Sequence, residues 1–216
     1  EMTCPTCRRP VQSEPTPEQK PLIPTSVYAV SKRDQEELCL SVGRSYRIPT
    51  VALRYFNVYG PRQALSNPYT GVCAIFSARI KNANPPLIFE DGRQSRDFVH
   101  VSDIVQANLL AMTNPKADDE VFNVGTGRPT SIGQIAAILG TLYGGEAEPT
   151  LTQKFRAGDI RHCYADISRL TRLGFAPTVS LQDGLRDLAA WGKEQTATDR
   201  VEKAAKELEA YGLAQG

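Results

Sequence analysis

Length, composition and charge limit the kind of protein this sequence can encode. Its 216 residues suffice for one good core or two small ones, and 41% hydrophobic with 23% charged residues is ordinary for a globular domain. Lys and Arg number 25 against 24 Asp and Glu, so the charge suggests neither nucleic acid nor an anionic membrane as a partner. No apolar run approaches the ~20 residues that span a bilayer, and no signal-peptide region is apparent, so we expect a cytoplasmic protein.

The N-terminal segment, residues 1–26, is rich in proline and lacks an apolar period, so we expect an irregular loop. Within it, Cys4 and Cys7 have the C-x-x-C spacing in which two thiolates hold one tetrahedral zinc ion. A closed site needs two more ligands, and the other cysteines and histidines are poorly spaced to supply them. The spacing therefore predicts half of a zinc site, with a redox pair as the alternative. The five cysteines together indicate reduced thiols rather than a disulfide framework.

Tyr28 and Lys32 stand four residues apart in segment 27–46, which we expect to be a helix with Thr25 or Ser26 as its N-cap. Residues at this spacing share one helix face, so a phenol and an ammonium can address the same ligand. A nearby cation favours the phenolate form of a phenol, which makes such a pair suited to proton abstraction. An ordinary exposed helix face is the alternative interpretation.

The next segment, 50–56, is β-branched and apolar on both faces, which is typical of a strand buried in a parallel sheet. Tyr55, Asn57 and Tyr59 lie at its carboxyl end. Open α/β sheets bind ligands beyond the carboxyl ends of their strands, so we expect a site there. A turn role before Gly60 is the alternative for Asn57.

Strands and helices continue to alternate along the chain, which favours an α/β fold. We expect helices over 72–80, from Asp103 onward, over 131–143, from Ser180 onward and over 201–211, and strands over 87–89, 98–101 and 120–124. In the helix from Asp103, the residues Val105, Leu109 and Met112 lie along one apolar face. We interpret Gly125-Thr126-Gly127 as a strand-to-helix turn.

Two side chains around the strand 98–101 suggest different roles. Arg96 presents a permanently charged fork that suits a pyrophosphate, although an ion pair with Asp97 or Asp103 would also explain it. His100 alternates with apolar neighbours on the strand, so we expect a structural side chain rather than a base.

Four stretches together resemble the extended short-chain dehydrogenase/reductase family, in its nucleotide-sugar epimerase and dehydratase branch. They are Tyr28-Ala29-Val30-Ser31-Lys32, residues 53–63, residues 91–101 and residues 156–166. The resemblance runs from about Pro21 to about Trp191. No glycine-rich strand-turn-helix precedes Tyr28, so the sequence resembles the C-terminal two-thirds of such an enzyme.

The resemblance implies an α/β fold that comprises the C-terminal part of a Rossmann-like doubly wound parallel sheet and a small α/β substrate-binding subdomain. Residues 27–63 and 98–128 would form the remainder of the NAD-binding domain. Residues 64–97 and 129–192 would form the substrate-binding subdomain. Residues 193–216 would be a C-terminal helical tail.

The resemblance also assigns individual roles. Tyr28 and Lys32 would be catalytic and would contact the cofactor NAD together with Tyr55. The nucleotide-diphosphate sugar would be bound by Asn57, Val72, Leu87, Phe89, Arg96, Arg156 and Asp159, of which Arg156 would contact the diphosphate and Asp159 a ribose hydroxyl.

The implied reaction is NAD-dependent epimerisation of a UDP- or dTDP-hexose at C4 through a keto-sugar. Segment 66–71 and the cysteine-bearing segment look most like dTDP-L-rhamnose 4-epimerases. A 4,6-dehydratase is one alternative, and a truncated, non-catalytic nucleotide-sugar-binding fragment is another. The family's habit also implies a homodimer through the Tyr28 helix.

Overall fold

The computed structural model describes residues 3–67, 69–144, 148–156, 159–211 and 214–215. The larger helices are α1 (Val27–Tyr46), α2 (Val72–Lys81), α3 (Val101–Thr113), α4 (Ile132–Tyr143), α6 (Leu181–Glu194) and α7 (Val201–Ala210). Two short helical segments are η1 (Pro115–Ala117) and α5 (Ser168–Arg172). The strands are β1 (Ala52–Tyr55), β2 (Asn57–Tyr59), β3 (Leu87–Ile88), β4 (Ser95–His100), β5 (Val121–Val124), β6 (Pro129–Ser131), β7 (Thr150–Leu151), β8 (Phe155–Arg156), β9 (His162–Cys163) and β10 (Ala214–Gln215).

The strands pair mainly in parallel. β1 pairs with β5, β2 with β4, β3 with β7 and β4 with β9, all in parallel, whereas β6 joins β4 and β10 joins β8 in antiparallel fashion. Parallel partners require crossover connections, which the helices between them supply. The α/β class predicted from the sequence is confirmed.

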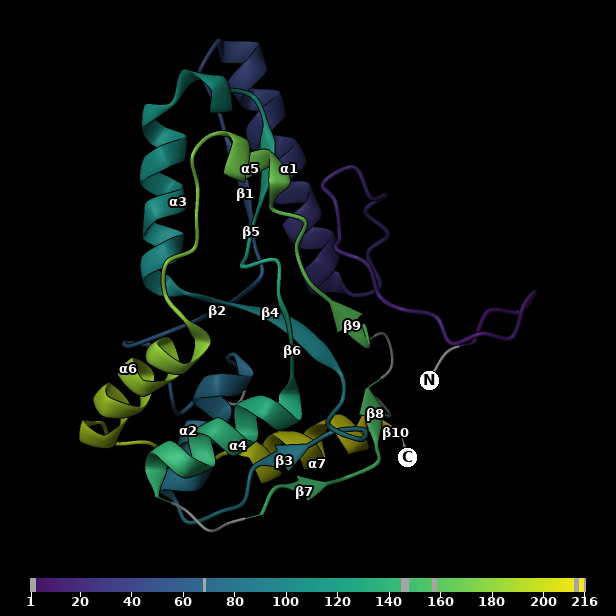
Figure 1. Ribbon diagram of the computed structural model, residues 1–216, viewed down its shortest axis with the longest axis vertical. Helices are drawn as coiled ribbons and strands as arrows, with labels where there is room; N and C mark the ends of the chain where they lie inside the picture. Colours follow the sequence, from purple (N-terminus) through teal and green to yellow (C-terminus); the bar gives the residue numbers. More distant parts are fainter. Residues whose placement is uncertain (1–2, 68, 145–147, 157–158, 212–213, 216) are drawn as a thin grey trace.

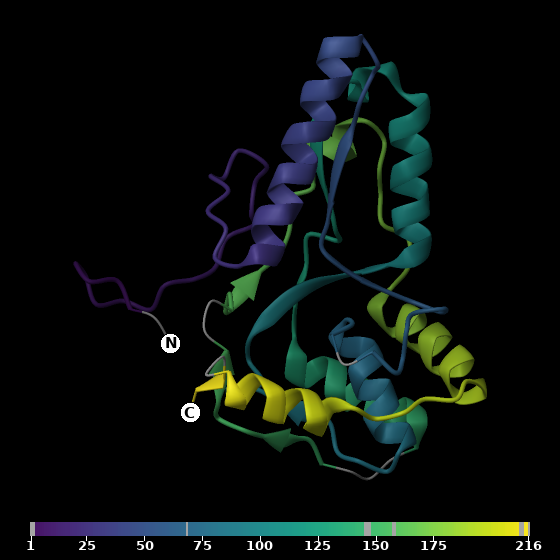
Figure 2. The ribbon, with the colours of Figure 1, turned by 180° about the vertical axis from the view of Figure 1, so that it is seen from behind.

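Two groups of elements are visible in the ribbon views. Figures 1 and 2 show α1, α3 and α5 around the β1–β5 pair at one end, and α2, α4, α6 and α7 gathered at the other. β2 and β4 run between the groups. Each group has its own hydrophobic cluster, one including Phe122 and Val124 beside β1, the other including Phe76, Leu185 and Leu188.

Helix α1 has the bounds that its sequence predicts. Ser26 caps its N-terminus by accepting the N–H of Ala29 at 3.1 Å, and Arg47 ends it in a left-handed conformation. Glu36 on this helix accepts two hydrogen bonds from Arg54 of β1, both at 2.7 Å. This bidentate pair fixes the helix against the strand and raises the pKa of Arg54.

The β1 strand and helix α3 differ from expectation in burial. β1 was expected to be buried on both faces, but its residues are only partly buried and Tyr55 is 46% exposed. Within the described chain, β1 has one partner strand, so one edge is open. The face of α3 formed by Val105, Leu109 and Met112 points to solvent, because α3 packs through Ile104 and smaller residues.

Several local predictions hold. His100 is buried and structural, since its Nδ1 accepts the N–H of Ser102 at the start of α3. Ser131 caps α4 in a capping box with Gln134. Over the described helices, none is both long and apolar enough to cross a membrane.

Candidate active site

A pocket of about 270 Å³ opens among α2, β3, β4 and α7. Its lining includes six of the seven residues predicted to bind a nucleotide sugar, namely Asn57, Val72, Leu87, Phe89, Arg96 and Asp159. They come from separate elements spread over about a hundred residues of sequence. The fold therefore brings them together, while their roles as ligand contacts stay predictions. The seventh, Arg156, lies on β8, and its side chain is outside the described part of the structure.

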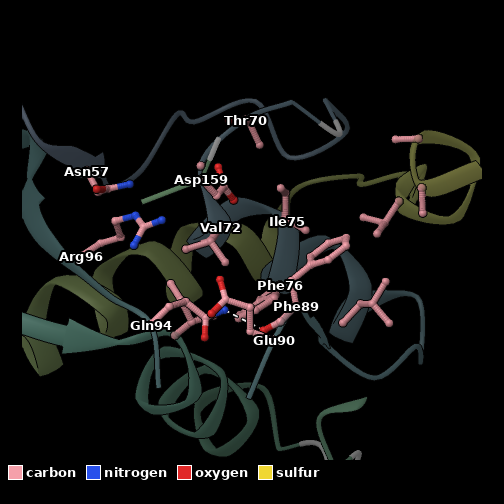
Figure 3. Close-up of a pocket in the computed structure, with 16 residues that line it drawn as sticks. Asn57, Thr70, Val72, Ile75, Phe76, Phe89, Glu90, Gln94, Arg96 and Asp159 are labelled. Carbon is pink, nitrogen blue, oxygen red and sulfur yellow. Dashed lines mark hydrogen bonds between the residues drawn. The ribbon is translucent and has the colours of Figure 1, made fainter. Parts of the chain in front are cut away.

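Polar groups gather at one end of the pocket, and the adjoining part is mainly apolar, with Glu90 and Gln94 also beside it. Figure 3 shows the amide of Asn57, the guanidinium of Arg96 and the carboxylate of Asp159 toward one end, with apolar side chains next to them. These apolar side chains are Val72, Ile75, Phe76 and Phe89. Such a division suits a ligand with a charged part and a flat, apolar part.

Arg96 is oriented by the backbone around it. Its Nη1 donates to the carbonyl oxygens of Ser95 at 2.9 Å and Arg161 at 3.0 Å. These bonds engage one nitrogen of the guanidinium and leave the rest of the fork free of protein partners among the described residues. The ion pair predicted as an alternative, with Asp97 or Asp103, does not form. Asp97 instead accepts from Thr126 and Asp103 from Thr178.

Arg161 forms ion pairs at the rim of the pocket. The sequence analysis did not predict this contact. Arg161 pairs with Glu90, a pocket residue, and its Nη2 lies 2.8 Å from Asp91. The hydrogen bond from Arg161 lowers the pKa of Asp91 to about 2, and the two carboxylates raise the pKa of Arg161. Since about 70 residues separate these partners, no local sequence signal could have revealed the pair.

The sequence analysis also did not predict that helix α7 lines the pocket. Val201, Ala204 and Ala205 line one wall, although the sequence predicts only an amphipathic tail helix here. The segment is anchored by a buried ion pair, in which Arg79 of α2 lies 3.1 Å from Asp199. The apolar face through Val201 and Ala205 was the available signal, but it does not specify what the face covers.

Tyr28 and Lys32 lie together on the first turns of α1, as their spacing predicts. The Lys32 Nζ is 5.5 Å from the centroid of the Tyr28 ring, and Tyr28 is 71% exposed. Lys32 also donates to Gln35 at 3.3 Å. Both ribbon views place this end of α1 toward the group of elements that holds the pocket (Figures 1 and 2). The pair is therefore accessible to a ligand, and its catalytic role stays a prediction.

The described residues fit one end of NAD only. Tyr55 lies at the carboxyl end of β1, half exposed, and its hydroxyl donates to Asn108 at 2.9 Å. Arg54, the residue before it, pairs instead with Glu36 of α1, so the Tyr55 side chain points to the α3 face of β1 and away from α1. Of the three residues predicted to contact NAD, Tyr28 and Lys32 thus lie together and offer exposed aromatic and cationic groups suited to a nicotinamide riboside. The turn after β5, Gly125–Gly127, cannot cradle phosphate, because the N–H groups of Thr126 and Gly127 already bind a carboxylate.

That carboxylate belongs to Asp97, which is fully buried. It accepts the N–H groups of Thr126 at 2.8 Å, Gly127 at 2.9 Å and Ala165 at 3.1 Å, and the Thr126 hydroxyl at 2.7 Å. A Cβ on Gly125 would lie 2.5 Å from Asp97, so only glycine fits there. The turn is thus structural, but it leads from β5 into strand β6 rather than directly into a helix, as the sequence had predicted.

Cys4 and Cys7 lie far along the N-terminal arm and do not approach the pocket. Both are free thiols, Cys4 partly buried and Cys7 exposed. The backbone amides of Cys7 and Thr6 bond to the Cys4 sulfur and lower the pKa of its thiol. Within the described residues, no three His, Cys, Asp or Glu side chains gather as a complete metal site.

Comparisons with known proteins agree with this geometry. The sequence pattern of the NAD dependent epimerase/dehydratase family matches residues 4–125. A dTDP-L-rhamnose 4-epimerase of Burkholderia thailandensis is 39% identical over 171 residues, which cover 78% of this chain and 46% of that protein. The chain thus spans about half the length of such relatives.

Solved structures give the same result. A UDP-glucose 4-epimerase of Thermotoga maritima, solved with UDP-glucose, is 39% identical with a TM-score of 0.77, over 86% of this chain and 59% of that one. A UDP-glucuronic acid 4-epimerase of Bacillus cereus, solved with UDP-glucuronic acid and NAD, is 34% identical with a TM-score of 0.76, over 85% and 57%. Since the family pattern covers more than half of the chain, this protein belongs to the NAD-dependent epimerase/dehydratase family.

Proposed function

We propose that this chain carries the sugar-nucleotide pocket and the catalytic base of an NAD-dependent 4-epimerase that acts on a UDP- or dTDP-hexose. The observation that carries the proposal is the pocket, which gathers Asn57, Arg96 and Asp159 from three distant segments around one polar end. The related proteins named above are 4-epimerases of dTDP-rhamnose, UDP-glucose and UDP-glucuronic acid, which supports this substrate class.

In the proposed binding mode, the polar end of the pocket holds the diphosphate and ribose. The free nitrogens of Arg96 can donate paired hydrogen bonds to phosphate oxygens. Asn57 can donate its amide to a phosphate or sugar oxygen, and Asp159 can accept from a ribose hydroxyl. The apolar side chains of Val72 and Phe89 then face the base. Binding energy collected here would position the hexose without touching its reacting carbon.

The catalytic step is assigned to Tyr28. As phenolate, it would take the proton of the C4 hydroxyl, and the ammonium of Lys32, 5.5 Å from its ring, would stabilise that negative charge. NAD+ supplies the hydride acceptor and donor that such chemistry needs. Tyr28 would then return the proton to the same oxygen after the keto-sugar has presented its other face. The anchored nucleotide lets the sugar turn while the diphosphate stays in place.

Two alternative functions make different predictions. A 4,6-dehydratase would share the pocket and Tyr28 but would eliminate water, and a non-catalytic fragment would bind nucleotide without turnover. We favour the 4-epimerase because the related proteins described above are 4-epimerases. A dTDP-L-rhamnose substrate is the finer form of the proposal, because segment 66–71 and the cysteine-bearing segment resemble dTDP-L-rhamnose 4-epimerases, whereas the identity of 39% is the same for the UDP-glucose 4-epimerase.

We further propose a cytoplasmic homodimer that associates through α1. The support is an exposed apolar row on that helix, at four-residue spacing: Leu38 is 63%, Val42 50% and Tyr46 74% exposed. Light scattering tests this directly. We expect twice the chain mass for the wild type and a single chain mass for Val42→Asp.

The function is tested by cofactor content, ligand protection and turnover on one preparation. We expect UDP or dTDP to raise the melting temperature, and NAD to be detected by absorbance after denaturation. A panel of nucleotide sugars should then show conversion between C4 epimers. Protection by UDP without bound NAD and without turnover would favour the non-catalytic reading. Absence of protection by either nucleotide would contradict the proposal.

A further inference from the structure

The tail that follows α6, residues 195–210, lies beyond Trp191, where the family resemblance ends, so the resemblance assigns it no role. Figure 2 shows α7 lying across the group that contains α2 and α4, joined to α6 by a linker. Val201, Ala204 and Ala205 of α7 nevertheless line the proposed nucleotide pocket. The wall that they form therefore depends on what holds the tail in place.

Asp199 joins the linker both to α2 and to the start of α7. Its Oδ2 accepts from Nη1 of Arg79 at 3.1 Å and from Nδ2 of Asn84 at 2.7 Å. Its Oδ1 accepts the N–H of Val201, two residues on, at 2.9 Å, as an aspartate does in an Asx-turn. One side chain thus docks the tail on α2 and sets the point where α7 begins.

The ion pair between Asp199 and Arg79 is buried, with 8% and 4% of the two side chains exposed. A buried guanidinium that loses its carboxylate keeps the cost of desolvation without compensation, so the loss of one partner is strongly unfavourable. Glu202 also approaches Arg79, at 4.0 Å, but its side chain is 74% exposed and the interaction is screened by solvent. Docking of the tail on α2 therefore depends mainly on Asp199.

Two further contacts join the tail to the loop that precedes α2. The Thr198 N–H donates to Oγ of Ser66 at 2.9 Å, and the Tyr69 hydroxyl donates to the Glu207 carboxylate at 3.1 Å. Residues 70–71 of the same loop line the pocket. The tail thus connects α2 with a loop that forms another part of the pocket lining.

We propose that Asp199 is a positioning residue of the nucleotide site, which holds α7 in the docked position where Ala204 and Ala205 face the bound base. The inference rests on the proposed function, since it takes the nucleotide to be the ligand of the pocket. If the nucleotide binds only to the docked form, its apparent affinity falls in proportion to the docked fraction. The nucleotide must in turn favour the docked tail, because such coupling is reciprocal.

Asp199→Asn tests the proposal at nearly constant side-chain volume. Asparagine carries one side-chain oxygen, so it cannot accept from Val201 and from Arg79 at the same time. We expect the Kd for UDP, measured by calorimetry, to rise roughly 10-fold as the docked fraction falls. Trypsin should cleave faster after Lys203 and Lys206, which are exposed on α7, because cleavage follows the population of the open form. Saturating UDP should slow the same cleavage in the wild type.

Two further variants make the test specific to this ion pair. Glu202→Gln is the matched control, because it removes the exposed carboxylate near the same arginine, and it should change neither the Kd nor the cleavage rate. Adding Asn84→Asp to Asp199→Asn returns a carboxylate to the hydrogen bond beside Arg79, so the double variant should recover most of the lost affinity. Protection of the tail by UDP needs no variant, so it decides the case if Asp199→Asn does not fold.

Faster tail cleavage with an unchanged Kd would mean a purely structural role for Asp199 and would overturn the proposal. A weaker Kd without faster cleavage, or wild-type cleavage that UDP does not slow, would overturn it as well. An equal loss of affinity in Glu202→Gln would overturn the assignment to Asp199. In each of these cases the wild type still binds UDP, so the proposed function stands. A wild type that does not bind UDP would contradict the proposed function and overturn this inference with it.

Discussion

The pocket region and the β1–β5 region differ in how completely their surfaces are covered. Around the pocket, Ile135, Leu185 and Leu188 are fully buried, and residues of α2, α4 and α7 line the space itself. Beside β1, Tyr55 is 46% exposed and Met112 of α3 is 81% exposed. The proposed nucleotide site is therefore a pocket lined by packed elements of the chain. Tyr28, the proposed catalytic base, lies instead on an exposed helix surface. Binding and turnover should therefore respond differently to substitution.

The largest expected effect separates turnover from binding. Tyr28→Phe removes the proposed base, so we expect kcat to fall roughly 10²–10⁴-fold in a preparation that turns over nucleotide sugar. The affinity for UDP should stay within about twofold, because Tyr28 does not line the pocket. Steady-state kinetics and calorimetry on the same protein check both statements. Equal losses of kcat and affinity would show that the two regions are not separable in this way.

A pair of core substitutions measures the difference in packing. Leu185→Ala should lower the free energy of unfolding by ~2–5 kcal/mol, since Leu185 is fully buried. The same truncation at Leu53 of β1, which is only partly buried, should lower it by roughly half as much. Urea unfolding followed by circular dichroism gives both values. A larger loss at Leu53 would mean that the β1 side is better packed than its exposure indicates.

The wall formed by α7 is tested by filling the pocket from that side. Ala204→Leu should weaken UDP binding by ~1–3 kcal/mol, because a larger side chain at this buried position intrudes on the lined space. Lys203→Leu is the matched control on the exposed face of the same helix and should leave affinity unchanged. If Ala204→Leu binds as tightly as the wild type, α7 is not part of the nucleotide site.

The smallest expected effect concerns the ion pair between Arg161 and Asp91 at the pocket rim. Because the pKa of Asp91 is lowered to about 2, its ion pair contributes stability above the unfolded value of ~3.9 and loses it as the pH falls toward 2. Asp91 is 38% exposed, so the contribution should stay below ~1 kcal/mol. Urea unfolding should show Asp91→Asn less stable than the wild type at pH 6, with the difference shrinking by pH 3. A constant difference would point to a cause other than this titration.

Local signals in the sequence were sufficient for much of the fold. The caps of α1 and α4 follow from Ser26 and Ser131, whose side chains bond within three residues. Asn57 was predicted to lie at a site because it follows a strand, and Arg96 because of its charged fork, whereas the other pocket residues were predicted only through the family resemblance. What the sequence did not reveal depends on contacts distant along the chain, such as Arg161 with Asp91 and α7 with the pocket.

Burial beside β1 was mispredicted for a related reason. An apolar strand and an apolar helix face normally indicate a covered surface. Whether a cover exists depends on neighbouring elements, and β1 has one partner strand in the described chain. The exposed face of Leu109 and Met112 cannot be distinguished from a core face by periodicity alone.

Calorimetric titration of the chain with UDP and dTDP tests the central claim, that the pocket binds the nucleotide part of the substrate. We predict saturable binding at one site per chain, weakened roughly 10–100-fold by Arg96→Ala, as expected for loss of a charged hydrogen-bonding group worth ~1.5–3 kcal/mol. Arg128→Ala, at an exposed position outside the pocket lining, should bind like the wild type. Binding that is absent, or that both arginine variants weaken equally, would contradict the assignment of this pocket.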